Sequence, residues 1–350
     1  MSDFLWGRAG VLIGPSAGTG RAHECESALA AWLEGRETAV CEGRFSGSGA
    51  QKGWTRLEAA AAVGAAGGGA SRGYVEELRA SVAAFAAWGA DLLVCVGGDG
   101  LASYAADAML ASGKRMAMLG IAAGTINVGP IVSAGIDEFE KWGASPDAAP
   151  DELAIEPTAA VEVLVDGRHV AYGFNDVVIG DTYLGTVGGR AASLSAAALL
   201  ERGEKVEAAP SGDITAADFG VFKNGKKLAA RLGRPAQIIA SPLGKREFFA
   251  RAVAGALCNA PYMEGPAALA LFDTVIVQAG APARGIENFA AAETLLFEPG
   301  DLVELRGLAS AGQLIVDGNP YARSGATVGL KSVPGLVDVV KTGRRCLGGI

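Results

Sequence analysis

The feature that most constrains the fold is an apolar run ending in a glycine cluster, LLVCVGGDG at residues 92–100. A run that is apolar at every position, rather than at alternate positions, is typical of a parallel strand covered on both faces. A helical pattern follows over 101–112. Strand, glycine turn and helix in this order predict one unit of a doubly wound α/β sheet. The turn would then lie at the carboxyl end of a strand, where open α/β folds bind ligands.

The neighbouring segments repeat this alternation. Apolar runs predict strands at 10–14, 38–41 and 116–122, and apolar residues at helical spacing predict helices at 22–34 and 75–88. We therefore expect residues 1–150 to form an α/β domain with a doubly wound parallel sheet, in which the GGDG turn follows a central strand.

A different pattern begins after SPDAAPDE at residues 145–152. Tight-turn pairs then recur between strand-like runs: Asp166-Gly167, Asn224-Gly225 and Asp317-Gly318. We expect 151–330 to form a mostly antiparallel, β-rich domain, interrupted by a helix at 245–258. The C-terminal segment 331–350 is expected to return to the N-terminal domain.

Gly97, Gly98 and Gly100 suggest a phosphate-binding turn, because backbone N–H groups without neighbouring Cβ atoms can approach an anion closely. Asp99 would repel phosphates unless it binds a metal or takes a proton, and phosphoryl transfer needs both functions. A plain tight turn in which Asp99 caps the helix is the alternative, and the tetrapeptide alone does not decide between them. GPSAGTG (14–20) matches neither the P-loop nor the Rossmann pattern.

Composition excludes several classes of function. Thirty basic against thirty-eight acidic residues give a net charge of −8 without a Lys/Arg block, so we expect no nucleic-acid partner. Two histidines make His-based catalysis improbable, and five scattered cysteines without a CxxC pair are typical of a reducing cytoplasm. We find no signal peptide, no membrane-spanning run and no basic amphipathic helix, and expect no stable membrane association.

Four further stretches follow GGDG: IAAGTINVGP (121–130), GFNDVVIG (173–180), IIASPLGKREFF (238–249) and VDGNPY (316–321). In this order they resemble the superfamily that joins NAD kinases with diacylglycerol- and sphingosine-type lipid kinases. The resemblance implies a two-domain NAD kinase-like fold, ATP and Mg²⁺ as cofactors, and a homodimer or homotetramer. It makes Asp99 the catalytic base and adds Gly124, Thr125 and Asn127 to the phosphate-binding set, while the metal ligands stay unassigned.

The acceptor-binding residues also follow from the resemblance. GFNDVVIG is similar to the Asn-Glu/Asp element of NAD kinases, which assigns Asn175 and Asp176 to the acceptor, and ASPLG resembles a nucleotide-contacting element, which adds Ser241 and Gly244. The first hypothesis is therefore an ATP-dependent kinase acting on the 2′-hydroxyl of NAD to give NADP.

Departures from the family pattern keep other functions open. Leu101 replaces the Thr of GGDGT, Lys245-Arg246-Glu247-Phe248 replaces Ser-Thr-Ala-Tyr, and GPSAGTG resembles a turn of lipid kinases and of acetoin-catabolism protein X. The alternatives are a kinase of a small hydroxy compound, a lipid kinase, and a nucleotide-binding regulator without catalysis. The sequence does not choose between NAD and NADH, or between ATP and polyphosphate.

Overall fold

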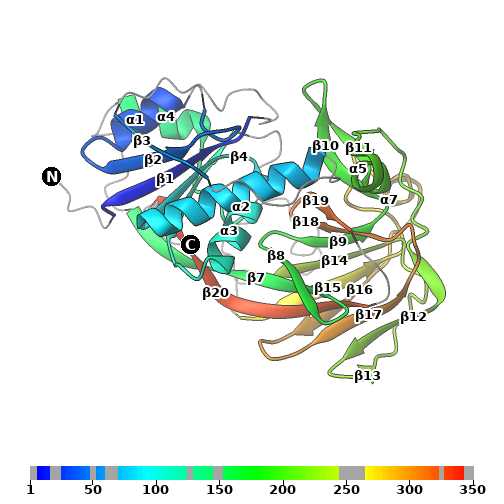
Figure 1. The fold of residues 1–350 in the computed structure, drawn as a ribbon. Helices are drawn as coiled ribbons and strands as arrows, with labels where there is room; N and C mark the ends of the chain where they lie inside the picture. The colour runs from blue at the N-terminus through cyan, green and yellow to red at the C-terminus, as the bar shows by residue number, and fades with distance from the viewer. Residues whose placement is uncertain are drawn as a thin grey trace, which may run out of the picture. The chain divides into compact units, whose positions relative to one another are not determined.

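The computed structural model describes residues 6–15, 25–47, 53–59, 70–123, 129–144, 153–243, 265–322 and 327–342. The chain divides into two compact units (Figure 1). The first comprises residues 1–127, 131–158 and 337–350, and the second comprises 128–130 and 159–336. Predicted site residues Gly124, Thr125, Asn127 and Gly244, and the predicted helix at 245–258, lie outside the described residues.

A parallel sheet forms the centre of the first unit, as predicted. Its strands are β1 (Arg8–Ile13), β2 (Glu37–Cys41), β3 (Thr55–Leu57), β4 (Leu92–Gly97), β5 (Ala117–Ala122), β6 (Ala134–Gly135) and the end of β20 (Val328–Thr342). The order is β20-β5-β4-β1-β2-β3, every neighbouring pair is parallel, and β6 pairs with β5. Both faces of β4 are buried, which explains why its sequence is apolar throughout.

Helices cover both faces of this sheet. They are α1 (Glu26–Trp32), α2 (Ala70–Trp88), α3 (Asp99–Ala111) and α4 (Ile136–Ala144). Trp32 of α1 and Phe139 of α4 meet edge to face and share one core with alternate residues of β1 and β4. On the other face α2 lies so close that a Cβ at Gly10 would fall 2.5 Å from the ring of Phe85. The sheet is therefore doubly wound.

The second unit is built from antiparallel strands, again as predicted. They are β7 (Leu153–Val165, which begins in the first unit), β8 (Arg168–Gly173), β9 (Val177–Gly180), β10 (Thr182–Val187), β11 (Arg190–Ser195), β12 (Thr215–Lys223), β13 (Lys226–Lys227), β14 (Gln237–Pro242), β15 (Ala267–Phe272), β16 (Ala292–Phe297), β17 (Val303–Leu308), β18 (Gln313–Val316) and β19 (Asn319–Tyr321). One layer has the order β13-β12-β17-β20, with β7 pairing β20 and β8. The other has the order β16-β15-β14-β9-β18-β19, and β10 and β11 form a separate hairpin.

Two-residue turns fix the hairpins of this unit. The three predicted Asx-Gly pairs connect β7 to β8, β12 to β13 and β18 to β19. Their first residues have φ values of 49° at Asp166, 52° at Asn224 and 47° at Asp317, and the glycines that follow are also at positive φ. Positive φ at both positions defines the turn whose twist matches that of the paired strands, and Asx-Gly tolerates it best. Local turn chemistry therefore sets the register of these hairpins.

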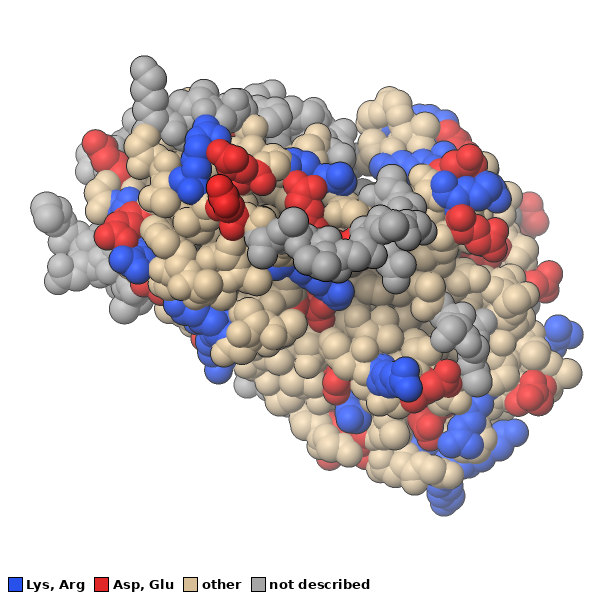
Figure 2. Space-filling view, in the orientation of Figure 1, with Lys and Arg blue, Asp and Glu red and all other residues tan. Residues whose placement is uncertain are grey.

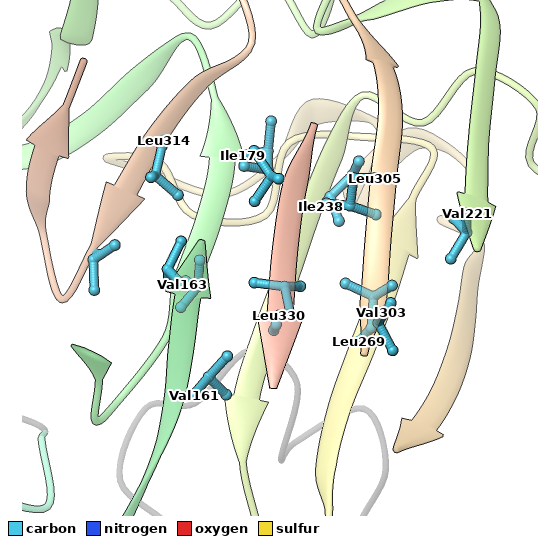
Figure 3. Close-up of a cluster of buried hydrophobic side chains, with 14 of the residues drawn as sticks. Val161, Val163, Ile179, Val221, Ile238, Leu269, Val303, Leu305, Leu314 and Leu330 are labelled. Atoms are coloured by element: carbon cyan, nitrogen blue, oxygen red, sulfur yellow. The ribbon is translucent and has the colours of Figure 1, made fainter. Parts of the chain in front are cut away.

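The core of the second unit lies between its two layers. Figure 3 shows side chains from both layers pointing toward one another, among them Val163 and Leu330 from one layer and Ile179, Ile238 and Leu269 from the other. A second apolar cluster lies on the opposite face of the β14-containing sheet and includes Leu194 of β11. Because β9 and β14 are buried on both faces, the loops that follow or precede them have a rigid support.

Two short helices of the second unit were not expected from the sequence: α5 (Ala196–Arg202) and α7 (Ala283–Glu287). The sequence carries capping signals for α5, since the hydroxyl of Ser195 accepts the N–H of Ala198 at 3.2 Å and Gly203 ends the helix at φ 70°. A seven-residue helix is too short to show a clear helical period. None of the described helices is long and apolar enough to cross a membrane.

Candidate functional site

Asp99 lies where β4 of the first unit gives way to α3. Gly98 is the N-cap of the helix, in an extended conformation with φ −96° and ψ 174°, and Asp99 is the first helical residue. The helix therefore starts two residues before the predicted position. The alternative in which the Asp99 side chain caps this helix is wrong, because the cap position belongs to Gly98. Asp99 is nevertheless buried, with 9% of its surface exposed.

The position of Asp99 has a defined electrostatic setting. A carboxylate in the first turn of a 13-residue helix lies at the positive end of the helix dipole, which also attracts any anion bound nearby. On the face shown in Figure 2, acidic and basic side chains are interspersed rather than gathered by sign. An anionic ligand of this acidic chain would therefore depend on local groups such as this helix terminus, rather than on a broad positive field.

Gly97 and Leu101 fit one another within the turn. A Cβ at Gly97 would lie 2.6 Å from Cδ2 of Leu101, and a Cβ at Gly14 would lie 3.2 Å from the same atom. Leu101 is buried, and its N–H donates to the Gly98 carbonyl at 3.1 Å. The exchange of the family's Thr for Leu101 is thus a packing feature: the leucine side chain fills space left by two glycines.

Three strands of the first unit end side by side at this point. The N–H of Gly14, after β1, donates to Val96 of β4 at 2.8 Å, and the N–H of Ala123, after β5, donates to Gly97 at 2.9 Å. Gly124 is the next residue along the chain from Ala123. Thr125 and Asn127, which the sequence adds to the phosphate site, follow it beyond the described residues. The roles assigned to these three residues stay predictions.

An ion pair holds α3 against α2. Arg79 Nη2 of α2 lies 3.2 Å from Oδ2 of Asp107, which is buried two turns after Asp99. Tyr74 of α2 packs edge to face against Phe45, which lies after β2, and against Tyr104 of α3. These contacts fix the helix whose first residue is Asp99. The sequence did not identify Arg79, Tyr74 or Tyr104, because their importance lies in contacts between helices and not in any local motif.

Asn175, Asp176 and Ser241 come together in the second unit. Asn175 Nδ2 donates to Asp176 Oδ2 at 3.0 Å, and Ser241 Oγ donates to the Asn175 carbonyl at 2.6 Å. Asn175 and Ser241 are buried, with 6% and 1% exposure. Ser241 therefore supports the backbone of the Asn175–Asp176 pair through β14. Gly244, assigned to the same set, lies outside the described residues.

The amide oxygen of Asn175 is a buried acceptor. Within the part of the chain that the structure describes, Asn175 Oδ1 accepts no hydrogen bond. An unsatisfied buried acceptor costs about 1–3 kcal/mol, so such an atom in a native fold calls for an explanation such as a ligand donor. A substrate hydroxyl or N–H would supply that donor.

The described residues do not form a cluster of metal-ligating side chains. Among the described residues there is no group of three or more His, Cys, Asp or Glu side chains that could hold one. Mg²⁺ commonly binds through one or two carboxylates together with substrate phosphates, and Asp99 fits that limited role. Any Mg²⁺ would then be held mainly by the nucleotide.

The described cysteines offer no nucleophile. Cys25, Cys41 and Cys95, the cysteines of the described segments, are buried and form no disulfide. Burial raises the pKa of Cys95 to about 12 and that of Cys41 to about 11. Because the thiolate is the reactive form, these thiols are inert at neutral pH. Covalent cysteine chemistry therefore does not compete with phosphoryl transfer as an explanation of this site.

Comparisons with known proteins place these features in context. Residues 8–164 match the family model of the diacylglycerol kinase catalytic domain. A crystal structure of yeast NADH kinase complexed with NADH is similar over 96% of this chain and 83% of its own, at 11% identity and a TM-score of 0.50. Two structures of a putative diacylglycerol kinase from Bacillus anthracis str. Sterne are similar over 97% of this chain, at 11% identity.

The two Bacillus anthracis structures have TM-scores of 0.53 and 0.54, and the similarity covers 98% and 99% of their own chains. No curated protein shows significant similarity in sequence. At this identity the structural likeness shows the fold alone. It is the two-domain fold that the motifs implied, with an α/β unit followed by a mostly antiparallel one.

Proposed function

We propose that the chain, whose residues 8–164 match the family model of the diacylglycerol kinase catalytic domain, belongs to the superfamily that joins NAD kinases with diacylglycerol kinases and is an ATP-dependent kinase acting on the 2′-hydroxyl of NAD. The observation that carries the proposal is the placement of Asp99. It is a buried carboxylate at the carboxyl end of a central parallel strand, in the first turn of a helix and among the glycines of the GGDG motif.

Asp99 is the catalytic base in this proposal. Its carboxylate takes the proton of the acceptor hydroxyl as the oxygen attacks the γ-phosphorus of ATP, and ADP leaves with the electrons of the broken P–O bond. The nucleotide phosphates lie over Gly97, Gly98 and Gly100, with Gly124, Thr125 and Asn127 assisting. The amino end of α3 stabilises their negative charge. Mg²⁺ supplies additional charge neutralisation when bound to the phosphates.

Asn175 and Asp176 orient the acceptor. The hydrogen bond between Asn175 and Asp176 fixes both side chains, and Asn175 Oδ1 can accept a hydrogen bond from a ligand. A ribose diol offers two O–H donors, so a carboxamide oxygen and a carboxylate suit it. The bound NADH named for the yeast relative is consistent with such an acceptor.

A lipid acceptor is the second candidate, favoured by the match of residues 8–164 to the diacylglycerol kinase catalytic domain. The free hydroxyl of diacylglycerol also donates to a carboxamide oxygen, so the side chains of Asn175 and Asp176 suit both molecules. An ADP-release assay with Mg-ATP would separate the candidates. The panel is NAD, NADH, diacylglycerol in mixed micelles, and small ketols and polyols, with identification of the phosphorylated product.

The assay should include Asp99→Asn. This variant keeps the size and the helix position of the side chain, so we expect a normal melting temperature and a loss of about 10³-fold or more in kcat. Asp107→Asn is the matched control, since it changes a buried carboxylate of the same helix that pairs with Arg79. It should cost stability and keep most of the activity. Comparable activity in Asp99→Asn and the parent protein would remove Asp99 from the mechanism.

The proposal also includes a reducing compartment such as the cytoplasm, in keeping with three buried cysteines that form no disulfide, and a homodimer or homotetramer as in the relatives that the motifs resemble. Light scattering coupled to size-exclusion chromatography would measure the assembly directly.

A further inference from the structure

The turn between β18 and β19 carries a second carboxylate, Asp317, which the sequence predicts as a turn residue within the VDGNPY stretch and to which it assigns no role in the site. We propose that Asp317 is a positioning residue that fixes the Asn175–Asp176 pair for acceptor recognition. The inference rests on the proposed function for its consequence in catalysis. The structural part of the inference, that Asp317 holds the loop of residues 174–176 in place, rests only on hydrogen bonds within the second unit.

Asp317 accepts hydrogen bonds from three consecutive backbone N–H groups. Oδ2 accepts the N–H of Phe174 at 2.9 Å, and Oδ1 accepts those of Asn175 at 2.8 Å and Asp176 at 3.0 Å. In return, the N–H of Asp317 donates to the Asp176 carbonyl at 3.0 Å. Asp317 is 6% exposed, so these bonds are shielded from competing water.

Strand pairing explains how two segments more than 140 residues apart reach each other. Val316 of β18 stands opposite Val177 of β9, so the residue after β18 meets the residues before β9. The two-residue turn then sets φ at 47° for Asp317, and Asp is one of the few residues that tolerates this conformation. Asp317 therefore belongs to the turn between β18 and β19 and also holds the backbone of residues 174–176.

Two carbonyl groups of residues 174–176 also accept hydrogen bonds from within the protein. Ser241 Oγ donates to the Asn175 carbonyl, and the Asp176 carbonyl accepts from Asp317. Since the N–H groups of 174–176 and these two carbonyls are occupied, recognition by this loop falls to the side chains of Asn175 and Asp176. Their aim depends on a backbone that Asp317 and Ser241 hold in place.

The chemistry of the site requires a carboxylate. Only an acceptor with two oxygens can take three N–H donors in this arrangement. In Asp317→Asn one oxygen becomes an NH₂ group that faces the N–H of Phe174, so one bond is lost and a donor opposes a donor. Asn tolerates positive φ as well as Asp does, which leaves the turn itself intact.

The test compares Asp317→Asn with Asp166→Asn. Asp166 occupies the same position of an Asp-Gly turn at φ 49°, and its carboxylate accepts a backbone N–H from Thr327 at an exposed site. In Asp317→Asn we expect hydrogen exchange of the 174–176 amides to rise about 10-fold or more relative to the parent protein. KM for the acceptor should rise about 10- to 100-fold, while KM for ATP stays unchanged. Asp166→Asn should change none of these quantities.

The outcomes separate this inference from the proposed function. Faster exchange at 174–176 in a protein that phosphorylates none of the panel compounds would uphold Asp317 as the loop's support and reject the kinase. Unchanged exchange at these amides would overturn the positioning role whatever the activity. Equal rises in KM for ATP and for the acceptor, together with a lower melting temperature, would also overturn it, because they indicate general destabilisation. Ser241→Ala provides a second route, with a smaller effect of the same kind.

Discussion

The fit between Gly97 and Leu101 can be tested by a double-mutant cycle. Carbon atoms in contact prefer separations of about 3.5–4.0 Å, whereas a Cβ at residue 97 would lie 2.6 Å from Leu101 Cδ2 and 3.3 Å from Leu101 Cβ. Gly97→Ala must therefore push Leu101 out of its place by about 1 Å, and overpacking of this kind costs about 1–3 kcal/mol. Gly97 is not at positive φ, so the cost comes from this contact and not from the backbone.

Leu101→Ala removes the atom that clashes and leaves a small cavity, at a cost of about 2–3 kcal/mol. Adding Gly97→Ala to Leu101→Ala should then cost only about 0.5 kcal/mol, because the contact to the residue 101 Cβ remains close. The two substitutions should couple by about 1–2 kcal/mol, with the double variant more stable than the sum predicts.

Tryptophan fluorescence in urea is the assay of choice. All five tryptophans precede residue 143 and belong to the first unit, so their signal follows the unfolding of the unit that contains the turn. Gly73→Ala is the control, because nothing lies within 4 Å of a Cβ at that helical position. It should be neutral or stabilise α2. The reasoning fails if Gly97→Ala behaves like Gly73→Ala, or if the cycle is additive within about 0.3 kcal/mol.

Two further predictions concern the same unit. Burial raises the pKa of Cys95 from 9.0 to about 12. Above pH 9 the thiol therefore ionises in the unfolded chain but keeps its proton in the folded one. The free energy of unfolding should fall by up to about 1.4 kcal/mol per pH unit in this range, and this thiol should have no effect on it below pH 9. Urea titrations between pH 8 and 10.5 should show a flatter decline for Cys95→Ala, and equal slopes for both proteins would contradict the assignment. Gly120→Ala would place a Cβ 2.2 Å from the carbonyl oxygen of Ile131, a backbone atom that cannot move away by a side-chain rotation. We therefore expect the free energy of unfolding to fall by about 3 kcal/mol or more. A melting temperature near that of the parent protein would contradict this, because it would show that the backbone at Ile131 can shift.

The sequence predicts those parts of the fold that depend on short-range chemistry. Uniformly apolar runs such as residues 92–96 identify buried parallel strands, and Asx-Gly pairs identify hairpin turns because few other residues accept positive φ. The start of α3 differs because Asp99 and Gly100 look like turn residues in isolation. In the structure, an extended Gly98 ends the turn two residues earlier and lets the helix begin at Asp99.

The parts that the sequence does not predict depend on contacts between distant residues. The bonds from Asp317 to residues 174–176 span more than 140 positions and follow from the pairing of β18 with β9. Asp317 and Asp166 both begin Asp-Gly turns, and the VDGNPY stretch around Asp317 does not show which backbone groups its carboxylate would bind. Only burial and three converging N–H groups separate the first from the second. The support that Asp317 gives to residues 174–176 therefore becomes visible only in three dimensions.

The packing of Leu101 bears on whether catalysis is retained. If the residue after GGDG had to reach the substrate, its change from Thr to Leu would favour a nucleotide-binding regulator. Instead Leu101 is buried beside the places where Gly14 and Gly97 lack a side chain, so the leucine serves the shape of the turn. A turn maintained in this way still presents a buried carboxylate in the first turn of α3. The Leu101 departure thus gives no reason to separate this chain from active kinases, and the acceptor is the property on which experiment must decide.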